Sequence, residues 1–188
     1  MLKTRAFEVM VFTVILMVGS VSLAAEGLRS GPQPGDKLPS AFHPLNVTGE
    51  FAGKKHCLVC ENGLNPVVMI FAREVSEPLV QLIAKVDEVT AQNRQNEMGS
   101  FVVFLSFDED LEEQLPKLAK EKKLKHLILS IDHPAGPQDY QVAQAADVTV
   151  VLYTDHEVKA NHAFKKGELT DKAIERILAD VPKILPKK

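Results

Sequence analysis

Two cysteines three positions apart carry the clearest chemistry in this sequence. Cys57 and Cys60 flank a Leu-Val pair, and the chain contains two cysteines in all. At this spacing two thiols close a small disulfide ring, and such a pair exchanges with other thiols when one thiolate is favoured. His56 and two lysines directly precede the first cysteine and place positive charge beside it. These residue types predict a redox pair, with Cys57 attacking, Cys60 resolving and His56 as the neighbouring binding group.

Two other uses of the pair stay open. A purely structural disulfide between residues three apart constrains little of the unfolded chain, so it contributes about 2 kcal/mol at most. A zinc site would take His56, Cys57 and Cys60 as three ligands and would need a distant histidine as the fourth. Haem attachment is excluded, because Glu61 follows the second cysteine where a histidine is required. No cofactor is therefore expected.

The composition limits the classes of partner. With 45% hydrophobic residues in 188, the chain has enough apolar material for the core of one ordinary domain. Its 22 basic and 25 acidic residues give a net charge of -3, so there is no basic surplus for nucleic acid. A net acidic chain also lacks the polybasic density that binds membrane surfaces. We therefore expect no nucleic-acid partner. The cysteine pair instead predicts a partner that is a protein or small molecule bearing a thiol or disulfide.

The first residues are typical of an export signal. Lys3 and Arg5 precede an apolar run over residues 9–18, and small residues follow as far as Ala24. This order predicts a secretory signal peptide over residues 1–24. The run is too short to span about 30 Å of hydrocarbon, so we expect no stable membrane insertion after cleavage, with an uncleaved anchor as the alternative.

An exported chain is expected in the periplasm or the extracellular space, where a cysteine pair persists as a disulfide. The Gly- and Pro-rich residues that follow the signal predict an exported linker over residues 25–40 and one folded domain over residues 41–185. The triplet Asn-Val-Thr at 46–48 is a glycosylation sequon for a eukaryotic chain.

From residue 67 onward, apolar runs of strand length alternate with segments of helical period. Strands are predicted over residues 67–72, 101–106, 127–131, 148–153 and 158–164, and helices after Ser76, over 108–123, over 140–145 and after Thr170. Ser76 is interpreted as a helix N-cap with Pro78 in the first turn. Pro116 should kink its helix or mark its true start. The order β-α-β-α-β-(α)-β-β-α predicts an α/β fold around one mixed sheet.

Short motifs before this core support a family resemblance. Gly35 and Pro39 are spaced four apart and followed by Phe42, and Asn-Val-Thr-Gly follows at 46–49. Together with the element order, these residues resemble the thioredoxin-like fold, and within it the redoxin or peroxiredoxin-like branch. The resemblance spans residues 34–181. It implies a three-layer α/β sandwich with a central mixed sheet and an activity in thiol-disulfide exchange.

The chain departs from that family at two positions. The resemblance places the nucleophilic cysteine just after the first core strand, where this chain has Arg-Glu-Val-Ser-Glu-Pro at 73–78. It also implies a cis-proline before the facing strand, where this chain has Val148. The cysteine pair instead precedes the strand at 67–72, and a strand of that length covers about 20 Å. We therefore predict that the pair lies at the opposite end of the sheet from the family's site, and we expect no peroxidase activity.

Overall fold

A seven-stranded sheet forms the centre of this computed structural model, which describes residues 27–186. Its strands are β1 (Leu45–Asn46), β2 (Lys54–Lys55), β3 (Val67–Ala72), β4 (Gly99–Leu105), β5 (Leu127–Asp132), β6 (Val148–Thr154) and β7 (Glu157–Phe164). The helices are α1 (Leu58–Asn62), α2 (Glu77–Gln92), α3 (Leu111–Glu121) and α4 (Asp171–Ala179), with 3₁₀ turns η1 (Arg94–Asn96), η2 (Gln138–Tyr140) and η3 (Val181–Lys183). The signal peptide expected over residues 1–24 lies outside the described residues.

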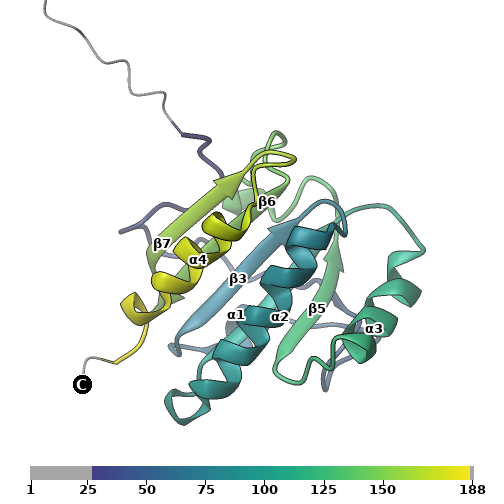
Figure 1. Cartoon of the computed structure of the whole chain (residues 1–188), viewed down its shortest axis with the longest axis horizontal. Coiled ribbons are helices and arrows are strands. Elements are labelled where there is room, and N and C mark those ends of the chain that lie inside the picture. Colours follow the sequence, from purple (N-terminus) through teal and green to yellow (C-terminus); the bar gives the residue numbers. More distant parts are fainter. Residues whose placement is uncertain (1–26, 187–188) are drawn as a thin grey trace, which may run out of the picture.

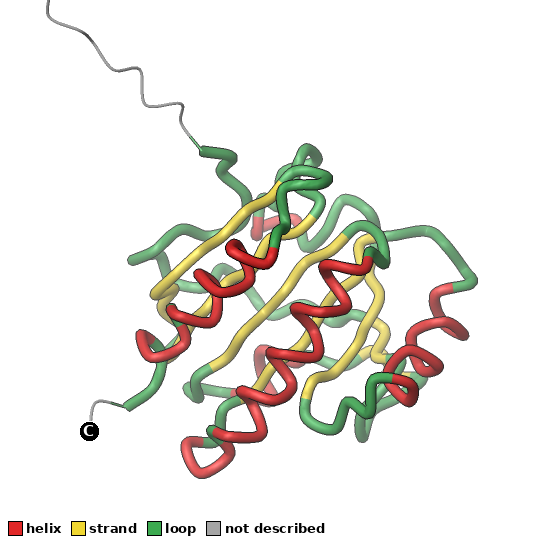
Figure 2. Tube along the Cα trace, in the orientation of Figure 1, coloured by secondary structure: helices red, strands yellow, loops and turns green. Residues whose placement is uncertain are grey.

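The sheet is mixed and covered on both faces. Its strand order is β2-β1-β5-β4-β3-β6-β7, with β3, β4 and β5 parallel and the neighbouring pairs β1 with β5, β3 with β6 and β6 with β7 antiparallel. The helices α2, α3 and α4 cover one face, and α1 lies on the other (Figures 1 and 2). This three-layer arrangement confirms the predicted α/β fold class.

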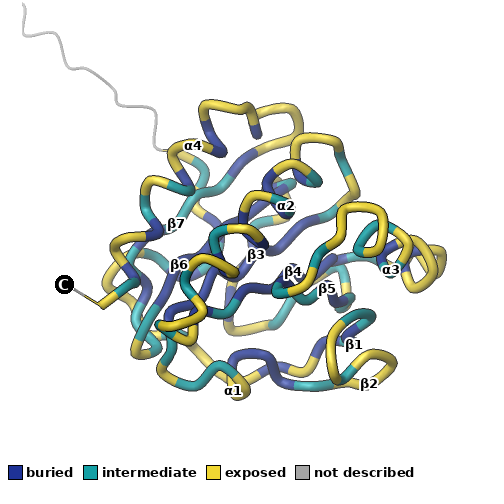
Figure 3. The backbone as a smooth tube through the Cα atoms, turned by 60° about the horizontal axis from the view of Figure 1, so that its bottom comes forward, coloured by how far each residue is buried: buried dark blue, intermediate teal, exposed yellow. Residues whose placement is uncertain are grey.

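The central strand β3 is buried on both faces, which is why its sequence is a continuous apolar run. Val68 and Ile70 pack into the cluster under α2, α3 and α4. Met69 and Phe71 point to the other face, into a second cluster that includes Tyr140. Because side chains alternate along a strand, both faces of β3 need apolar residues. Figure 3 shows this buried centre in dark blue.

Two helix predictions need correction. Pro116 lies inside α3, which begins at Leu111 and continues past the proline to Glu121, so it does not mark the start. The helix expected over residues 140–145 is only the 3₁₀ turn η2, because Gln141 has a φ of 51° and leaves the helical region. Farther along the chain, the carbonyls of Ala143 and Ala146 accept hydrogen bonds from the side chain of Arg73.

The segment expected to be a linker, residues 25–40, is packed against the sheet in its described part. Ser30 is buried, and its Oγ lies 2.6 Å from Oγ1 of Thr149 in β6. The Ser30 carbonyl accepts a 2.9 Å hydrogen bond from Nδ2 of Asn161 in β7. Lys37 forms an isolated bridge with Glu157. Residues 30–37 are therefore part of the folded domain, held by contacts to residues more than a hundred positions away.

The sequon at 46–48 is not available for modification in the folded chain. Asn46 is fully buried in β1, where it pairs with Ser130 of β5. The hydroxyl of Thr48 accepts a 2.8 Å hydrogen bond from the amide of Leu129. A glycan needs an exposed asparagine, so the buried Asn46 does not carry one in this folded structure. Within residues 27–186, no helix has the length and apolar character needed to cross a membrane.

Candidate functional site

Cys57 and Cys60 form a disulfide around the first turn of α1. Their Cα atoms are 5.3 Å apart. Cys57 occupies the N-cap position of α1, and its Sγ accepts a 3.1 Å hydrogen bond from the amide of Cys60. A donor aimed at sulfur favours its negatively charged form, so this contact supports a thiolate on Cys57 when the disulfide is broken.

The two cysteines differ sharply in exposure. Cys57 is only 4% exposed and packs in the second core cluster together with Leu58 and Val59. Cys60 is exposed. A thiol from solution therefore reaches the Cys60 side of the disulfide first, because exchange requires access to the attacked sulfur. The sequence-based expectation that Cys57 is the attacking thiol stays a prediction, and the exposure favours Cys60 as the sulfur that a partner meets.

The position of α1 is set by contacts at the edge of the sheet where β3 and β4 begin. Asn62, the last residue of α1, lies against Gly99, the first residue of β4. The amide of Asp155 and the hydroxyl of Thr154 donate hydrogen bonds of 3.0 and 3.3 Å to the carbonyl of Leu64. These contacts hold the connection from α1 to β3, whereas Ser76 follows the opposite end of β3.

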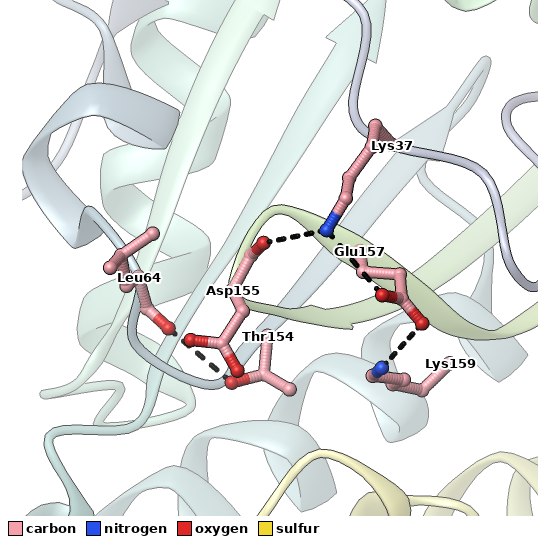
Figure 4. Close-up of polar contacts among 6 residues, drawn as sticks. All are labelled: Lys37, Leu64, Thr154, Asp155, Glu157 and Lys159. Atoms are coloured by element: carbon pink, nitrogen blue, oxygen red, sulfur yellow. Dashed lines mark hydrogen bonds and ion pairs between the residues drawn. The ribbon is translucent and has the colours of Figure 1, made fainter.

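The turn between β6 and β7 that holds Leu64 is itself anchored by charged groups (Figure 4). Glu157 lies between two lysines, with Oε1 2.6 Å from Nζ of Lys159 and Oε2 3.4 Å from Nζ of Lys37. The hydrogen bond and charge of Lys159, followed by those of Lys37, lower the pKa of Glu157. Lys37 also donates to the carbonyl of Asp155 at 3.5 Å. Lys37 and the connection from α1 to β3 therefore both contact the turn between β6 and β7.

His56 connects the two ends of the disulfide loop. Its Nε2 lies 3.1 Å from Oε2 of Glu61, the residue that follows Cys60. The imidazole ring stacks on Phe51, with ring centroids 3.7 Å apart and an angle of 11° between the planes. The His56 side chain is 29% exposed. Phe51 and Glu61 therefore position the imidazole ring of the residue next to Cys57.

The family resemblance places a cysteine just after β3. This chain has Arg73 directly after the end of β3, and its side chain has a structural role. The guanidinium of Arg73 donates hydrogen bonds of 2.9, 3.1 and 2.9 Å to the carbonyls of Pro134, Ala143 and Ala146. Burial lowers the pKa of Arg73, while the charge of Asp147 opposes this shift. These bonds fasten the connection between β5 and β6 to the end of β3.

Two other positions at this edge of the sheet also differ from the pattern that the resemblance implies: Ser76 before α2 and Val148 at the start of β6. Ser76 occupies the N-cap position of α2 as predicted, although its side chain makes no capping hydrogen bond. Val148 begins β6, and the described residues contain no cis peptide bond. Residues 27–186 also contain no group of three His, Cys, Asp or Glu side chains that could hold a metal ion, and the sulfurs of Cys57 and Cys60 are bonded to each other.

A cleft beside α1 brings together polar residues that sequence reasoning missed. It has a volume of about 420 Å³ and is lined by Glu61 and Asn62 of α1, Arg94 and Glu97 at η1, and His126 before β5. These residues come from three separate segments of the chain. Nothing in their local sequence indicates that they meet, because the meeting depends on the order of the strands.

Comparison with solved structures identifies the architecture. No protein-family model and no curated protein matches the sequence. The thioredoxin domain of a thiol-disulfide oxidoreductase from Bacteroides vulgatus matches 80% of this chain and 99% of its own length, at 12% identity and a TM-score of 0.57. The chain has a thioredoxin-like fold.

Two further structures show the same thioredoxin-like fold. A DsbF homologue from Corynebacterium diphtheriae is 12% identical, with 84% of this chain and 95% of that chain covered and a TM-score of 0.61. A thiol peroxidase from Chromobacterium violaceum is 13% identical, with 80% and 88% covered and a TM-score of 0.54. Identities this low establish the thioredoxin-like fold alone, so the chemistry has to be argued from the site.

The contact between α1 and β4 predicts a steric effect at Gly99. A Cβ atom at this position would overlap Oδ1 of Asn62. We expect Gly99→Ala to displace α1 and to lower the free energy of unfolding by about 1–3 kcal/mol, as overpacking does elsewhere. Urea denaturation followed by circular dichroism measures this loss.

Two variants control for the substitution itself. Gly27→Ala adds a methyl group where no atom lies within 4 Å, so it should leave the stability unchanged. The double variant Asn62→Ala/Gly99→Ala removes the overlapping side chain and should recover most of the loss. If Gly99→Ala is as stable as Gly27→Ala, Asn62 does not pack as described.

Proposed function

We propose that this chain is an exported thiol-disulfide redox protein that uses a Cys-x-x-Cys pair displaced upstream of the central strand β3. One observation carries the proposal: a disulfide joins an exposed cysteine, Cys60, to a buried one, Cys57, in a thioredoxin-like fold. A partner can contact the sulfur of Cys60, whereas the sulfur of Cys57 is bonded to it and shielded from solvent. This asymmetry suits exchange, because it separates the sulfur that meets the partner from the sulfur that resolves the intermediate.

The exchange proceeds through a mixed disulfide on Cys60. A partner thiolate attacks Sγ of Cys60, a new sulfur-sulfur bond forms, and the bond between Cys57 and Cys60 breaks. The electron pair of the broken bond stays on Cys57, where the amide of Cys60 stabilises it before it takes up a proton. A second partner thiol then releases Cys60, so that two thiols become one disulfide and the protein gains two electrons and two protons. The reverse sequence oxidises the protein.

His56 has a supporting role in this proposal. Its ring stacks on Phe51 and lies 3.1 Å from Oε2 of Glu61, which places an imidazole in the residue before Cys57. A cationic or proton-accepting imidazole there favours thiolate formation during exchange. In this proposal, His56 is a binding residue of the site, and Cys57 and Cys60 are its catalytic residues.

Partner class and location are inferred from the site and the N-terminal sequence. The partner is a protein or small molecule that bears a thiol or a disulfide. The charged start, the apolar run and the small residues within 1–24 support export to the periplasm or the extracellular space. An oxidising compartment would keep the pair in its disulfide form between exchanges.

The reduction potential of the pair tests this function. We expect a value between about -230 and -180 mV, in the range of proteins that exchange disulfides. It is measured by equilibrating the protein with defined mixtures of reduced and oxidised glutathione and counting free thiols by mass spectrometry. A potential below about -300 mV with no exchange toward glutathione would contradict the proposal.

A second candidate function is a binding or scaffold module in which the disulfide only locks the loop. The burial of Cys57, Leu58 and Val59 in one core cluster favours it, because these residues anchor the loop to the sheet. The double variant Cys57→Ser/Cys60→Ser separates the two candidates. Under the redox proposal, exchange is abolished and stability falls by at most about 2 kcal/mol. A larger loss, together with an inert disulfide in the unmodified chain, would favour the scaffold.

A further inference from the structure

A cleft whose lining begins at Glu61, the residue after Cys60, has the charges of a ligand site. Glu61 and Asn62 form its α1 wall, directly after the exposed Cys60. Arg94 and Glu97, at the two ends of the segment around η1, also line it. At about 420 Å³, the cleft is large enough for an amino acid or a short peptide.

One cation and one anion in this cleft are free to bind a ligand. Among the residues that the structure describes, neither Arg94 nor Glu97 forms an ion pair with another side chain, although they lie three positions apart. Both are exposed at the cleft. Two opposite charges that face one cleft without neutralising each other match a ligand that carries both charges.

A neighbouring side chain holds Arg94, and the backbone of Glu97 has an unusual conformation. Nη1 of Arg94 lies 3.0 Å from Nδ1 of His126, and because arginine only donates, Nδ1 is the acceptor of this bond. The remaining guanidinium donors of Arg94 are available for a carboxylate. Glu97 has a φ of 54°, a left-handed conformation that favours glycine or asparagine. A glutamate kept at such a position is consistent with a use for its side chain.

We propose that this cleft binds a small zwitterionic thiol, such as free cysteine or a short cysteine peptide, and presents it to Cys60. The carboxylate of the ligand pairs with Arg94 and its ammonium pairs with Glu97, so that its thiol lies next to the exposed end of the disulfide. The inference rests on the proposed function and names its substrate class. The bound thiolate forms a bond to Sγ of Cys60, the bond to Cys57 breaks, and Cys57 receives the electron pair and then a proton. A second thiol of the same class releases the first as a disulfide.

The test compares four thiols that reduce the disulfide of the purified protein. L-cysteine carries both charges, cysteamine carries the ammonium alone, 3-mercaptopropionate carries the carboxylate alone, and 2-mercaptoethanol carries neither. Each rate is divided by the rate of the same thiol with dithiodipyridine, an uncharged disulfide unrelated to the four thiols, which removes differences in intrinsic reactivity. We expect a normalised rate about tenfold higher for L-cysteine than for 2-mercaptoethanol, with the singly charged thiols between them.

Two variants assign the charges. Arg94→Gln should lower the normalised rate of L-cysteine to that of cysteamine, and Glu97→Gln should lower it to that of 3-mercaptopropionate. Arg176→Gln removes the same charge from α4, outside the cleft, and should change none of the rates. S-methyl-L-cysteine, which has both charges but no free thiol, should slow reduction by L-cysteine in the unmodified protein.

The outcomes separate this inference from the function on which it rests. Equal normalised rates for all four thiols, or rates unaffected by Arg94→Gln and Glu97→Gln, would overturn the zwitterion site while the redox function stands. A disulfide that none of the four thiols reduces would reject the redox function itself, and the inference with it.

Discussion

Replacing Cys57 with serine will leave Cys60 as an exposed, reactive thiol, whereas replacing Cys60 with serine will leave Cys57 almost inert. Cys57 is 4% exposed and lies in the core cluster under the sheet, so a reagent reaches its sulfur only after α1 opens locally. If that opening costs about 2.7 kcal/mol, Cys60 in Cys57→Ser will react about 100-fold faster than Cys57 in Cys60→Ser. The same asymmetry predicts that a mixed disulfide accumulates on Cys57→Ser and not on Cys60→Ser.

Alkylation with iodoacetamide, followed by mass spectrometry, measures both rates under native conditions. In a denaturant that unfolds both variants, the two thiols should react at similar rates, which shows that the native difference comes from burial. A faster native reaction at Cys57 would reverse the roles proposed for the two sulfurs. It would also show that α1 does not cover Cys57 in solution.

Removing the carboxylate of Asp87 will destabilise the domain strongly. Oδ1 of this buried residue in α2 accepts hydrogen bonds of 3.0, 2.7 and 2.8 Å from the amides of Lys125, His126 and Leu127. In Asp87→Ala, three amides at the start of β5 lose their acceptor, and the bond to the amide of Leu127 is buried. We expect the free energy of unfolding to fall by about 3 kcal/mol, and urea denaturation measures it.

Two neighbouring variants test the cause of that loss. Asp87→Asn keeps an oxygen that accepts, so it should be less damaging than Asp87→Ala. Glu88→Ala removes a carboxylate from an exposed position on the same helix and should change stability by less than about 0.5 kcal/mol. If Asp87→Ala behaves like Glu88→Ala, the three hydrogen bonds contribute little. Because His126 lines the cleft, Asp87→Ala should also weaken any selectivity for zwitterionic thiols.

The central elements were predictable from sequence because their signals are local. The run over 67–72 is apolar at every position, since both of its faces are buried, and the structure places β3 at the same residues. Thr170 was predicted as a helix cap, and its Oγ1 accepts a 3.3 Å hydrogen bond from the amide of Ala173. The strand and helix order then led to the thioredoxin-like fold that the structure has.

Elements that are held by residues far away in the sequence have no local sequence pattern that predicts them. The strands β1 and β2 have two residues each, too few to show a period. Residues 25–40 looked like a linker because they are rich in glycine and proline, yet Ser30 bonds to Thr149. Arg73 looked like an ordinary loop residue, and only the fold shows that it binds three carbonyls of the connection between β5 and β6.

The sequence by itself determined that the cysteine pair precedes the central strand and that no cysteine lies at 73–78. Only the tertiary structure decided that Cys57 is buried and Cys60 exposed, because exposure depends on how α1 packs against the sheet. It also decided that Arg94 and Glu97 meet α1 in one cleft. The parallel order of β3, β4 and β5 brings the starts of these strands to a single edge, and this arrangement is not encoded within any one segment.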